Sequence, residues 1–211
     1  MGTMDSADDL AAIAAATLAD YELRAQPFWE GTRDHDVSQN LDALLAAIKG
    51  ELPFVILDFG CGPGRDLRAL RARGHDPIGL DGTPRFVAMA RDYSGCEVWQ
   101  QDFLSLRLPD ARFDGVFANA TLQHVPTAAL PRVLGELRAA LKPGGVLFAS
   151  IPHGGGEEGW NRGRYSVYHS PAAWMRHLEV AGLVPIGHYF RPAGLPREAQ
   201  PWLATLSRRA P

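Results

Sequence analysis

The sequence predicts an α/β protein with a doubly wound, Rossmann-like sheet of seven mostly parallel strands, helices on both faces and an antiparallel strand at the C-terminus. Three observations indicate this fold. Short apolar runs alternate with helical segments between residues 54 and 151, a glycine-rich turn follows the first run, and acidic residues follow the next two. The 211 residues, 46% hydrophobic and 21% charged, suffice for one buried core.

The N-terminal quarter is expected to be helical. Residues 7–25 are rich in alanine, leucine and acidic side chains, and a second helix is predicted over 37–49, whose apolar stripe comprises Leu41, Leu44, Leu45 and Ile48. The polar segment 28–40 is then a connector. We expect residues 1–50 to form a helical lid on residues 51–211, within a single structural domain.

The remaining elements follow in alternation. The expected parallel strands are 54–57, 77–80, 97–99, 113–117 and 146–151, and the helices between them are 67–72, 85–91 and 130–141. Right-handed crossovers between such strands give a doubly wound sheet. After a glycine-rich loop at 154–163, we expect a helix at 171–181 and an antiparallel hairpin formed by 183–190 and 202–206.

Composition excludes several kinds of partner. The net charge of −3, with a single basic pair at Arg208 and Arg209, gives no field that attracts nucleic acid. Cys61 and Cys96 lack the spacing of a metal site or a disulfide framework. The acidic N-terminus and the short apolar run 10–19 predict neither a secretion signal nor a membrane segment, so we expect a cytoplasmic protein without a metal.

The turn after the first strand reads Leu57-Asp58-Phe59-Gly60-Cys61-Gly62-Pro63-Gly64. Alternate glycines allow a ligand to approach the backbone without a Cβ clash. A dinucleotide site requires G-x-G-x-x-G, whereas the spacing here is G-x-G-x-G. The turn therefore predicts a bound nucleoside that is not a dinucleotide.

Acidic residues follow the second and third strands. Asp81, beside Gly82, lies about 20 residues beyond the turn, where a carboxylate can accept both hydroxyls of a ribose. Asp102 and Phe103 offer an acceptor for an adenine amine and a ring to pack on the base. Singly, these residues fit a helix cap or an ordinary loop acid equally well. Together they occur at the carboxyl ends of successive strands, where open sheets bind ligands.

These segments resemble the class I methyltransferases over residues 54–150, through L-D-F-G-C-G-P-G, G-L-D-G and Q-D-F. The resemblance implies S-adenosylmethionine as cofactor and S-adenosylhomocysteine as product. It implies that Gly60, Gly62 and the backbone of Cys61 approach the methionine part, that Asp81 holds the ribose, and that Asp102 and Phe103 hold the adenine. Cys61 is expected to pack rather than react. The remaining predicted cofactor contacts are Tyr21, Phe28, Arg65, Gly82 and Asn119.

Two polar segments are candidates for an acceptor site, 28–40 and 160–169, together with His124 after the fourth strand. Simpler interpretations exist, because Asp36 or Ser38 can cap a helix, Trp29 can pack on the sheet, and a single histidine is commonly a packed one. These account for only part of so dense a polar segment.

The chain as a whole resembles the methyltransferase domain that ends the ovothiol-biosynthesis enzyme. The segments that carry this resemblance are F-W-E-G-T-R-D-H-D-V-S-Q-N (28–40), Y-S-G-C-E-V-W-Q-Q-D-F (93–103), F-A-N-A-T-L (117–122) and R-P-A-G-L-P-R (191–197). The resemblance implies methylation of an imidazole nitrogen of 5-thiohistidine to give ovothiol A. The chain begins shortly before Tyr21, which leaves no room for an iron-dependent sulfoxide synthase, so we expect any such synthase to be a separate partner.

Methyl transfer from a sulfonium is an in-line displacement that depends mainly on alignment, and a neutral imidazole already offers a lone pair at pH 7. We therefore expect Asn40, His124 and Asp36 to orient the acceptor ring. Trp29, Gln39, Arg164 and Tyr168 are expected to bind the rest of the acceptor. The alternatives are a methyltransferase for another small molecule such as a carboxylate or phenol, a catalytically silent cofactor-binding module, and an NAD-dependent oxidoreductase, which the glycine spacing disfavours.

Overall fold

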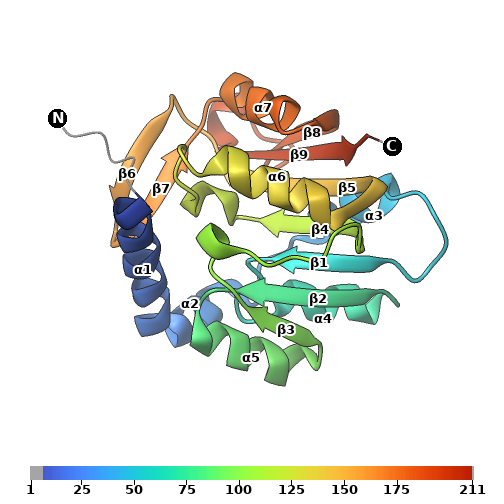
Figure 1. Ribbon diagram of the computed structural model, residues 1–211, viewed down its shortest axis with the longest axis horizontal. Coiled ribbons are helices and arrows are strands. Elements are labelled where there is room, and N and C mark those ends of the chain that lie inside the picture. The colour runs from blue at the N-terminus through green and yellow to red at the C-terminus, as the bar shows by residue number, and fades with distance from the viewer. Residues whose placement is uncertain (1–6, 211) are drawn as a thin grey trace.

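A computed structural model describes residues 7–210, so the acidic segment 1–6 of the predicted N-terminus lies outside the described residues. Figure 1 shows one layered α/β body. The helices are α1 (Ala7–Leu23), α2 (Ala25–Thr32), α3 (Ser38–Ala47), α4 (Arg65–Ala72), α5 (Pro84–Ser94), α6 (Leu130–Ala140) and α7 (Pro171–Val180), with short 3-10 turns η1 (Phe103–Ser105), η2 (Leu122–His124) and η3 (Arg197–Ala199). The strands are β1 (Val55–Phe59), β2 (Asp76–Asp81), β3 (Glu97–Gln100), β4 (Phe113–Asn119), β5 (Leu141–Pro152), β6 (Glu157–Asn161), β7 (Arg164–Tyr168), β8 (Leu183–Arg191) and β9 (Trp202–Arg209).

The main sheet has seven strands in the order β3-β2-β1-β4-β5-β9-β8, which confirms the predicted fold class. Strands β3, β2, β1, β4 and β5 are parallel, and β9 runs antiparallel to both β5 and β8. The predicted terminal hairpin is therefore correct. Strand β5 begins at Leu141 rather than at the expected 146, because Leu141 pairs with Phe113 before a register shift.

Apolar side chains cover both faces of the sheet. On one face, Leu41 and Leu44 of α3 and Ile48 just after it pack with Leu70 of α4 against β1, β4 and β5. On the other face, α6 and α7 bury the larger core, in which Trp174 is fully enclosed. Burial on both faces explains why the parallel strands read as continuous apolar runs. The carboxyl ends of these strands, toward α1 in Figure 1, are left for a ligand.

The N-terminal region contains three helices where two were predicted. Part of the expected connector at 28–40 is helical, since α2 extends to Thr32. The helix tolerates Pro27 because a proline in the first turn removes no intrahelical hydrogen bond. Helices α1 and α2 lie at the carboxyl ends of the strands (Figure 1), whereas α3 packs on the sheet. Of these three helices, the two that span residues 7–32 cover this edge.

The glycine-rich segment 154–163 was predicted to be a loop, and this was wrong. Residues Glu157–Asn161 and Arg164–Tyr168 pair as an antiparallel hairpin around Arg162 and Gly163. Both turn residues have positive φ, 51° and 89°, as a two-residue hairpin turn requires. The glycines hid the strand signal, and the hairpin packs against α1 through Ile13, Tyr165 and Val167. Within residues 7–210, no helix has the length and apolar content to cross a membrane.

Candidate active site

A cavity of about 750 Å³ opens at the carboxyl ends of the parallel strands. Helices α1 and α2, the turn after β1, the ends of β2 and β4, the hairpin β6/β7 and the end of β8 all contribute to its wall. This volume is within the usual range of small-molecule sites. Every predicted site residue except Gln39 and Asn40 lines it.

The turn after β1 brings bare backbone to the cavity. Gly60 and Gly62 have φ of 75° and 51°, which disfavour any side chain. A Cβ on Gly60 would lie 2.4 Å from Cγ2 of Thr121, so this glycine is also required by packing. The backbone N–H groups of Gly60 and Cys61 both donate to Leu80 O, at 2.8 and 3.0 Å, which ties the turn to β2.

Asp81 lies at the end of β2 with its side chain almost fully buried. Its Oδ2 accepts a hydrogen bond from Gly62 N at 3.0 Å, and its Oδ1 accepts one from Thr83 N at 2.8 Å. Burial raises the pKa of this carboxyl, and the two backbone donors oppose that shift. The carboxylate borders the cavity, and its oxygens are acceptors that ligand hydroxyls can reach.

The third strand leads to Asp102 and Phe103. Asp102 caps η1, because its Oδ1 accepts from Leu104 N at 2.9 Å, and the second carboxylate oxygen is free of that bond. The ring of Phe103 packs on Phe59 with centroids 4.4 Å apart and still borders the cavity. Asp102 therefore caps η1 and also borders the cavity.

Two buried groups beside the turn are not nucleophiles. Burial raises the pKa of the Cys61 thiol well above its usual value, with neighbouring acids adding to the effect, so the thiol stays protonated. Burial together with the charge of Asp66 raises the pKa of Asp58 well above its usual value.

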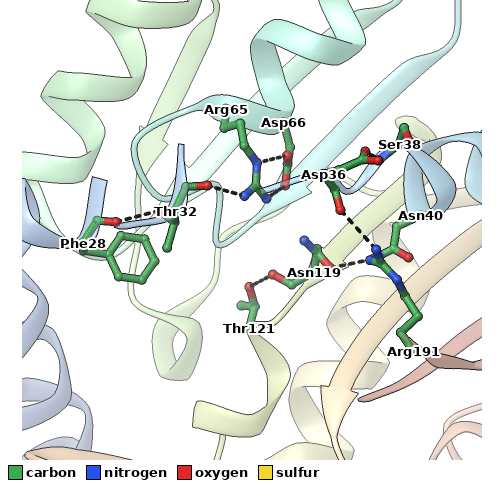
Figure 2. Close-up of polar contacts among 10 residues, drawn as sticks. All are labelled: Phe28, Thr32, Asp36, Ser38, Asn40, Arg65, Asp66, Asn119, Thr121 and Arg191. Carbon is green, nitrogen blue, oxygen red and sulfur yellow. Dashed lines mark hydrogen bonds and ion pairs between the residues drawn. The ribbon is translucent and has the colours of Figure 1, made fainter. Parts of the chain in front are cut away.

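Asp66 itself pairs with Arg65 at 2.7 Å, and Arg65 Nη1 donates to Thr32 O at 2.9 Å (Figure 2). Arg65 thus joins α2 to α4 at the cavity wall.

His124 connects the elements that close the cavity. Its Nδ1 lies 2.7 Å from Tyr165 O of the hairpin, and its Nε2 lies 2.8 Å from the hydroxyl of Tyr21 on α1. A carbonyl can only accept, so Nδ1 carries the proton and Nε2 accepts from Tyr21. Burial lowers the pKa of His124 to about 4, which keeps the ring neutral at pH 7. Both ring nitrogens are occupied within the protein, so His124 positions Tyr21 and the hairpin.

Asn40 lies behind the cavity wall and acts on Asn119, which lines it. Asn40 Nδ2 donates to Asn119 Oδ1 at 3.0 Å, and Asn40 Oδ1 accepts from the hydroxyl of Tyr189 at 2.9 Å. Asn40 is fully buried. This chain of three side chains fixes the amide of Asn119 and directs its Nδ2 donor away from Asn40 (Figure 2).

The predicted acceptor-binding residues of segment 28–40 occupy different places. Trp29 packs edge-on against Tyr93 at 4.7 Å and borders the cavity. Asp36 is exposed, and its Oδ1 accepts from Ser38 N at the start of α3. The N-cap residue of α3 is Val37, so neither Asp36 nor Ser38 is the cap that the simpler interpretation named. Hydrogen bonds with the side chain and the backbone of Ser38 lower the pKa of Asp36. Gln39 is exposed and outside the cavity wall. The density of polar residues in this segment therefore reflects helix ends as well as the cavity.

The two predicted hairpin residues are partly engaged. Arg164 Nε lies 3.5 Å from Asp20 Oδ2, and its guanidinium lies 4.9 Å from the centre of the Tyr21 ring. The hydroxyl of Tyr168 accepts from Asn161 Nδ2 at 2.6 Å. Both side chains border the cavity with part of their hydrogen-bonding capacity used inside the protein.

Several residues that were not predicted as site residues also line the cavity, and four of them come from the carboxyl-end side of the sheet or its last strands. Thr121 comes from the loop after β4, Ser150 from β5, Arg191 from β8 and Trp202 from β9. No local motif marks them, because the order of strands in the sheet brings them to this edge. Within residues 7–210, no three His, Cys, Asp or Glu side chains are grouped so as to hold a metal ion.

Comparison with known proteins finds a family model that matches part of the chain. Residues 56–145 match the model of a methyltransferase domain, and this stretch contains the glycine turn, Asp81 and Asp102. This stretch of the chain is therefore similar to a methyltransferase domain. Parts of the chain outside the matched stretch complete the cavity: helices α1 and α2, the hairpin β6/β7 and strands β8 and β9.

Curated relatives match about half of the chain. The chain is 36% identical over 113 residues to a trans-aconitate 2-methyltransferase of Methylobacterium radiotolerans, covering 52% of this chain and 42% of the relative. It is 33% identical over 115 residues to a malonyl-[acyl-carrier protein] O-methyltransferase of Pectobacterium atrosepticum, covering 54% and 45%. The chain matches less than half the length of these relatives.

Solved structures share the whole fold. A Burkholderia thailandensis 1,6-didemethyltoxoflavin-N1-methyltransferase, with bound 1,6-didemethyltoxoflavin and S-adenosylhomocysteine, superposes with a TM-score of 0.79 at 22% identity, covering 100% of this chain and 93% of that one. The DhpI structure, a complex with S-adenosylhomocysteine, gives 0.71 at 22% identity and covers 95% and 98%. At these identities the likeness shows the fold.

Proposed function

We propose that this protein binds S-adenosylmethionine in the cavity and transfers its methyl group to a small molecule. The observation that carries the proposal is the coincidence, in one cavity, of the bare glycine turn and the buried Asp81. The methyltransferase match over 56–145 contains both, and two solved structures of the same fold hold S-adenosylhomocysteine.

The residues at the cavity wall fit such a cofactor. The open side of Gly62, where a Cβ would meet only the Phe28 ring at 3.8 Å, admits a methionine moiety. Asp81 has acceptor positions for ribose hydroxyls, and Asp102 with Phe103 offers the acceptor and the apolar surface that an adenine requires. The bound cofactor supplies a methyl group on a positively charged sulfur.

The protein's own contribution is alignment and exclusion of water. Tyr21, Phe28 and Phe86 form an aromatic cluster with centroids 5.1 to 5.6 Å apart, which covers the cavity from α1, α2 and α5. The Tyr21–His124–Tyr165 hydrogen bonds fasten α1 to the hairpin above the same space. Holding an acceptor atom in line with a methyl group accounts for several kcal/mol of a displacement barrier.

For the acceptor, we propose an imidazole nitrogen of 5-thiohistidine, with ovothiol A as product. Support comes from the resemblance carried by 28–40, 93–103, 117–122 and 191–197. An uncharged imidazole nitrogen needs no strong base, which agrees with a site where His124 is already hydrogen-bonded at both nitrogens. Asn119 then orients the ring, with Asn40 as the positioning residue behind it.

A second candidate acceptor is a carboxylate oxygen. The names of two relatives specify trans-aconitate and malonyl-[acyl-carrier protein], which both carry carboxylates. Like a neutral imidazole, a carboxylate needs no base to attack a sulfonium methyl. The cavity wall also contains Arg191, which forms no ion pair with any residue between 7 and 210.

Incubation with methyl-labelled S-adenosylmethionine tests the proposal, with 5-thiohistidine, histidine, trans-aconitate and a phenol as acceptors. We expect label in thiohistidine at the imidazole nitrogen, located by mass spectrometry. Label in trans-aconitate alone would contradict 5-thiohistidine as the acceptor and support a carboxylate oxygen instead. Binding of S-adenosylhomocysteine without label in any acceptor would favour a catalytically silent module.

A further inference from the structure

We propose that Arg191 is the anchor for a carboxylate of the acceptor, so that the acceptor is an anionic small molecule. This rests on the proposed function and names the chemical class of its acceptor. Arg191 ends β8, the outermost strand of the sheet, and reaches the cavity beside the end of β4 (Figure 2).

Three arginines line the cavity, and they differ in how their charge is balanced. Arg65 forms two hydrogen bonds with the carboxylate of Asp66, at 2.7 and 2.9 Å. Arg164 pairs with Asp20. Arg191 has no ion pair within residues 7–210, and neither lysine of the chain contributes to the wall.

The donors of Arg191 are largely unused. Of its five N–H groups, one on Nη2 donates to the backbone oxygen of Asp36 at 3.1 Å. Its Nε is buried and has no partner within the described residues. The Asp36 carboxylate is close enough for this charge to lower its pKa, but it is hydrogen-bonded to Ser38 and forms no ion pair with the guanidinium.

These unused donors favour an anionic ligand. A buried donor without an acceptor, such as Nε of Arg191, costs free energy. A bound carboxylate supplies both an acceptor and a counter-charge, since its two oxygens match the planar fork of a guanidinium.

The position of Arg191 suits an anchor at the far end of an acceptor. Its hydrogen bond to Asp36 O fixes the guanidinium against the segment between α2 and α3. Asn119, at the end of β4, borders the same cavity. An acceptor with its carboxylate on Arg191 therefore extends toward Asn119 and the glycine turn. Both candidate acceptors fit this arrangement, because 5-thiohistidine and trans-aconitate each carry a carboxylate.

The test compares wild type with Arg191→Gln, which keeps polar character and removes the charge. Equilibrium binding to the protein saturated with S-adenosylhomocysteine is measured for 5-thiohistidine, trans-aconitate and the primary-amide analogue of each. We expect the wild type to bind at least one acid more tightly than its amide. We expect Arg191→Gln to lower the affinity for that acid by about 10- to 100-fold and to leave the affinity for the amide unchanged. Arg176→Gln is the matched control, because Arg176 is exposed on α7 and outside the cavity wall.

The outcomes separate this inference from the proposed function. Binding of S-adenosylhomocysteine is measured first in each variant, and its absence in wild type contradicts the proposed function alone. Three results overturn the role of Arg191. In Arg191→Gln, these are an equal loss of affinity for acid and amide, or an unchanged affinity for the acid. In the wild type, the result is that neither acid binds. A wild type that binds trans-aconitate through Arg191 and ignores thiohistidine supports the anchor and removes the first acceptor.

Discussion

The two halves of the cavity are built in different ways. The cofactor half comes from the turn after β1 and the ends of β2 and β3, which follow one another along the chain. The half that we propose for the acceptor joins residues far apart in the sequence: Tyr21 with His124 and Tyr165, and Asn40 with Asn119 and Tyr189. Two of these residues, Tyr21 and Asn119, were predicted from the sequence as cofactor contacts. The first half depends on backbone shape, and the second depends on side-chain hydrogen bonds between separate elements.

The largest effect is expected at the backbone of the cofactor half. Gly60→Ala adds a Cβ 2.4 Å from Thr121 and forces alanine into a positive φ. We expect a loss of about 2–5 kcal/mol in the free energy of unfolding, from strain and overpacking together. Gly74→Ala is the control, since Gly74 has a φ of 83° and open space, and it should lose only about 1–2 kcal/mol. Equal losses in chemical denaturation would remove the packing argument.

The hydrogen bonds that close the acceptor half predict a pH dependence. An unfolded histidine binds a proton near pH 6.5, whereas folded His124 does so only at about 4. As the pH falls from 6.5 to 4, the unfolded state binds a proton that the folded state does not bind. The free energy of unfolding therefore falls by about 2–3 kcal/mol. His169, with a pKa also lowered to about 4, adds to the wild-type loss.

The variant His124→Asn isolates the contribution of this one ring, because it removes one titrating group and leaves His169 in place. Chemical denaturation at pH 7 and at pH 5 should show a smaller loss of stability in the variant than in wild type. The same loss in both proteins would mean that His124 does not stay neutral in the folded protein.

The next largest effect is expected at Asn40, the buried amide of the acceptor half. Asn40→Leu leaves Asn119 and Tyr189 without their buried partner, and we expect a loss of about 1–3 kcal/mol in stability. Tyr189→Phe removes only the outer bond and should cost about 1 kcal/mol. Affinity for S-adenosylhomocysteine should change less than kcat in both variants. A loss of cofactor affinity equal to the loss of kcat would contradict the separation of the two halves.

The smallest effect is expected at Cys61. Its thiol is buried and its raised pKa keeps it protonated, so Cys61→Ala should leave kcat within about twofold of wild type. Methyl transfer to the best acceptor measures this directly. A loss of activity with unchanged stability would show that the thiol takes part in the reaction.

The same contrast explains what could be predicted before the structure. The order of strands and helices, the glycine turn, Asp81 and Asp102 follow from local patterns, because each is read from one strand and the residues after it. The hairpin β6/β7 was missed because its glycines interrupt the alternation of a strand, and α2 was missed because its polar residues resemble a connector. Arg191 was part of a noted segment, but nothing local shows that β8 brings it to the ends of the parallel strands.

The most direct test of the cofactor half, and of the central claim, is calorimetric titration of wild type and Asp81→Asn with S-adenosylhomocysteine and with NAD. Asparagine retains one acceptor oxygen and loses the charge and the second acceptor. We predict that wild type binds S-adenosylhomocysteine and not NAD, and that Asp81→Asn weakens this binding by about 10-fold or more. Tighter binding of NAD, or equal affinity of both proteins for S-adenosylhomocysteine, would contradict a methyl-donor site built on Asp81.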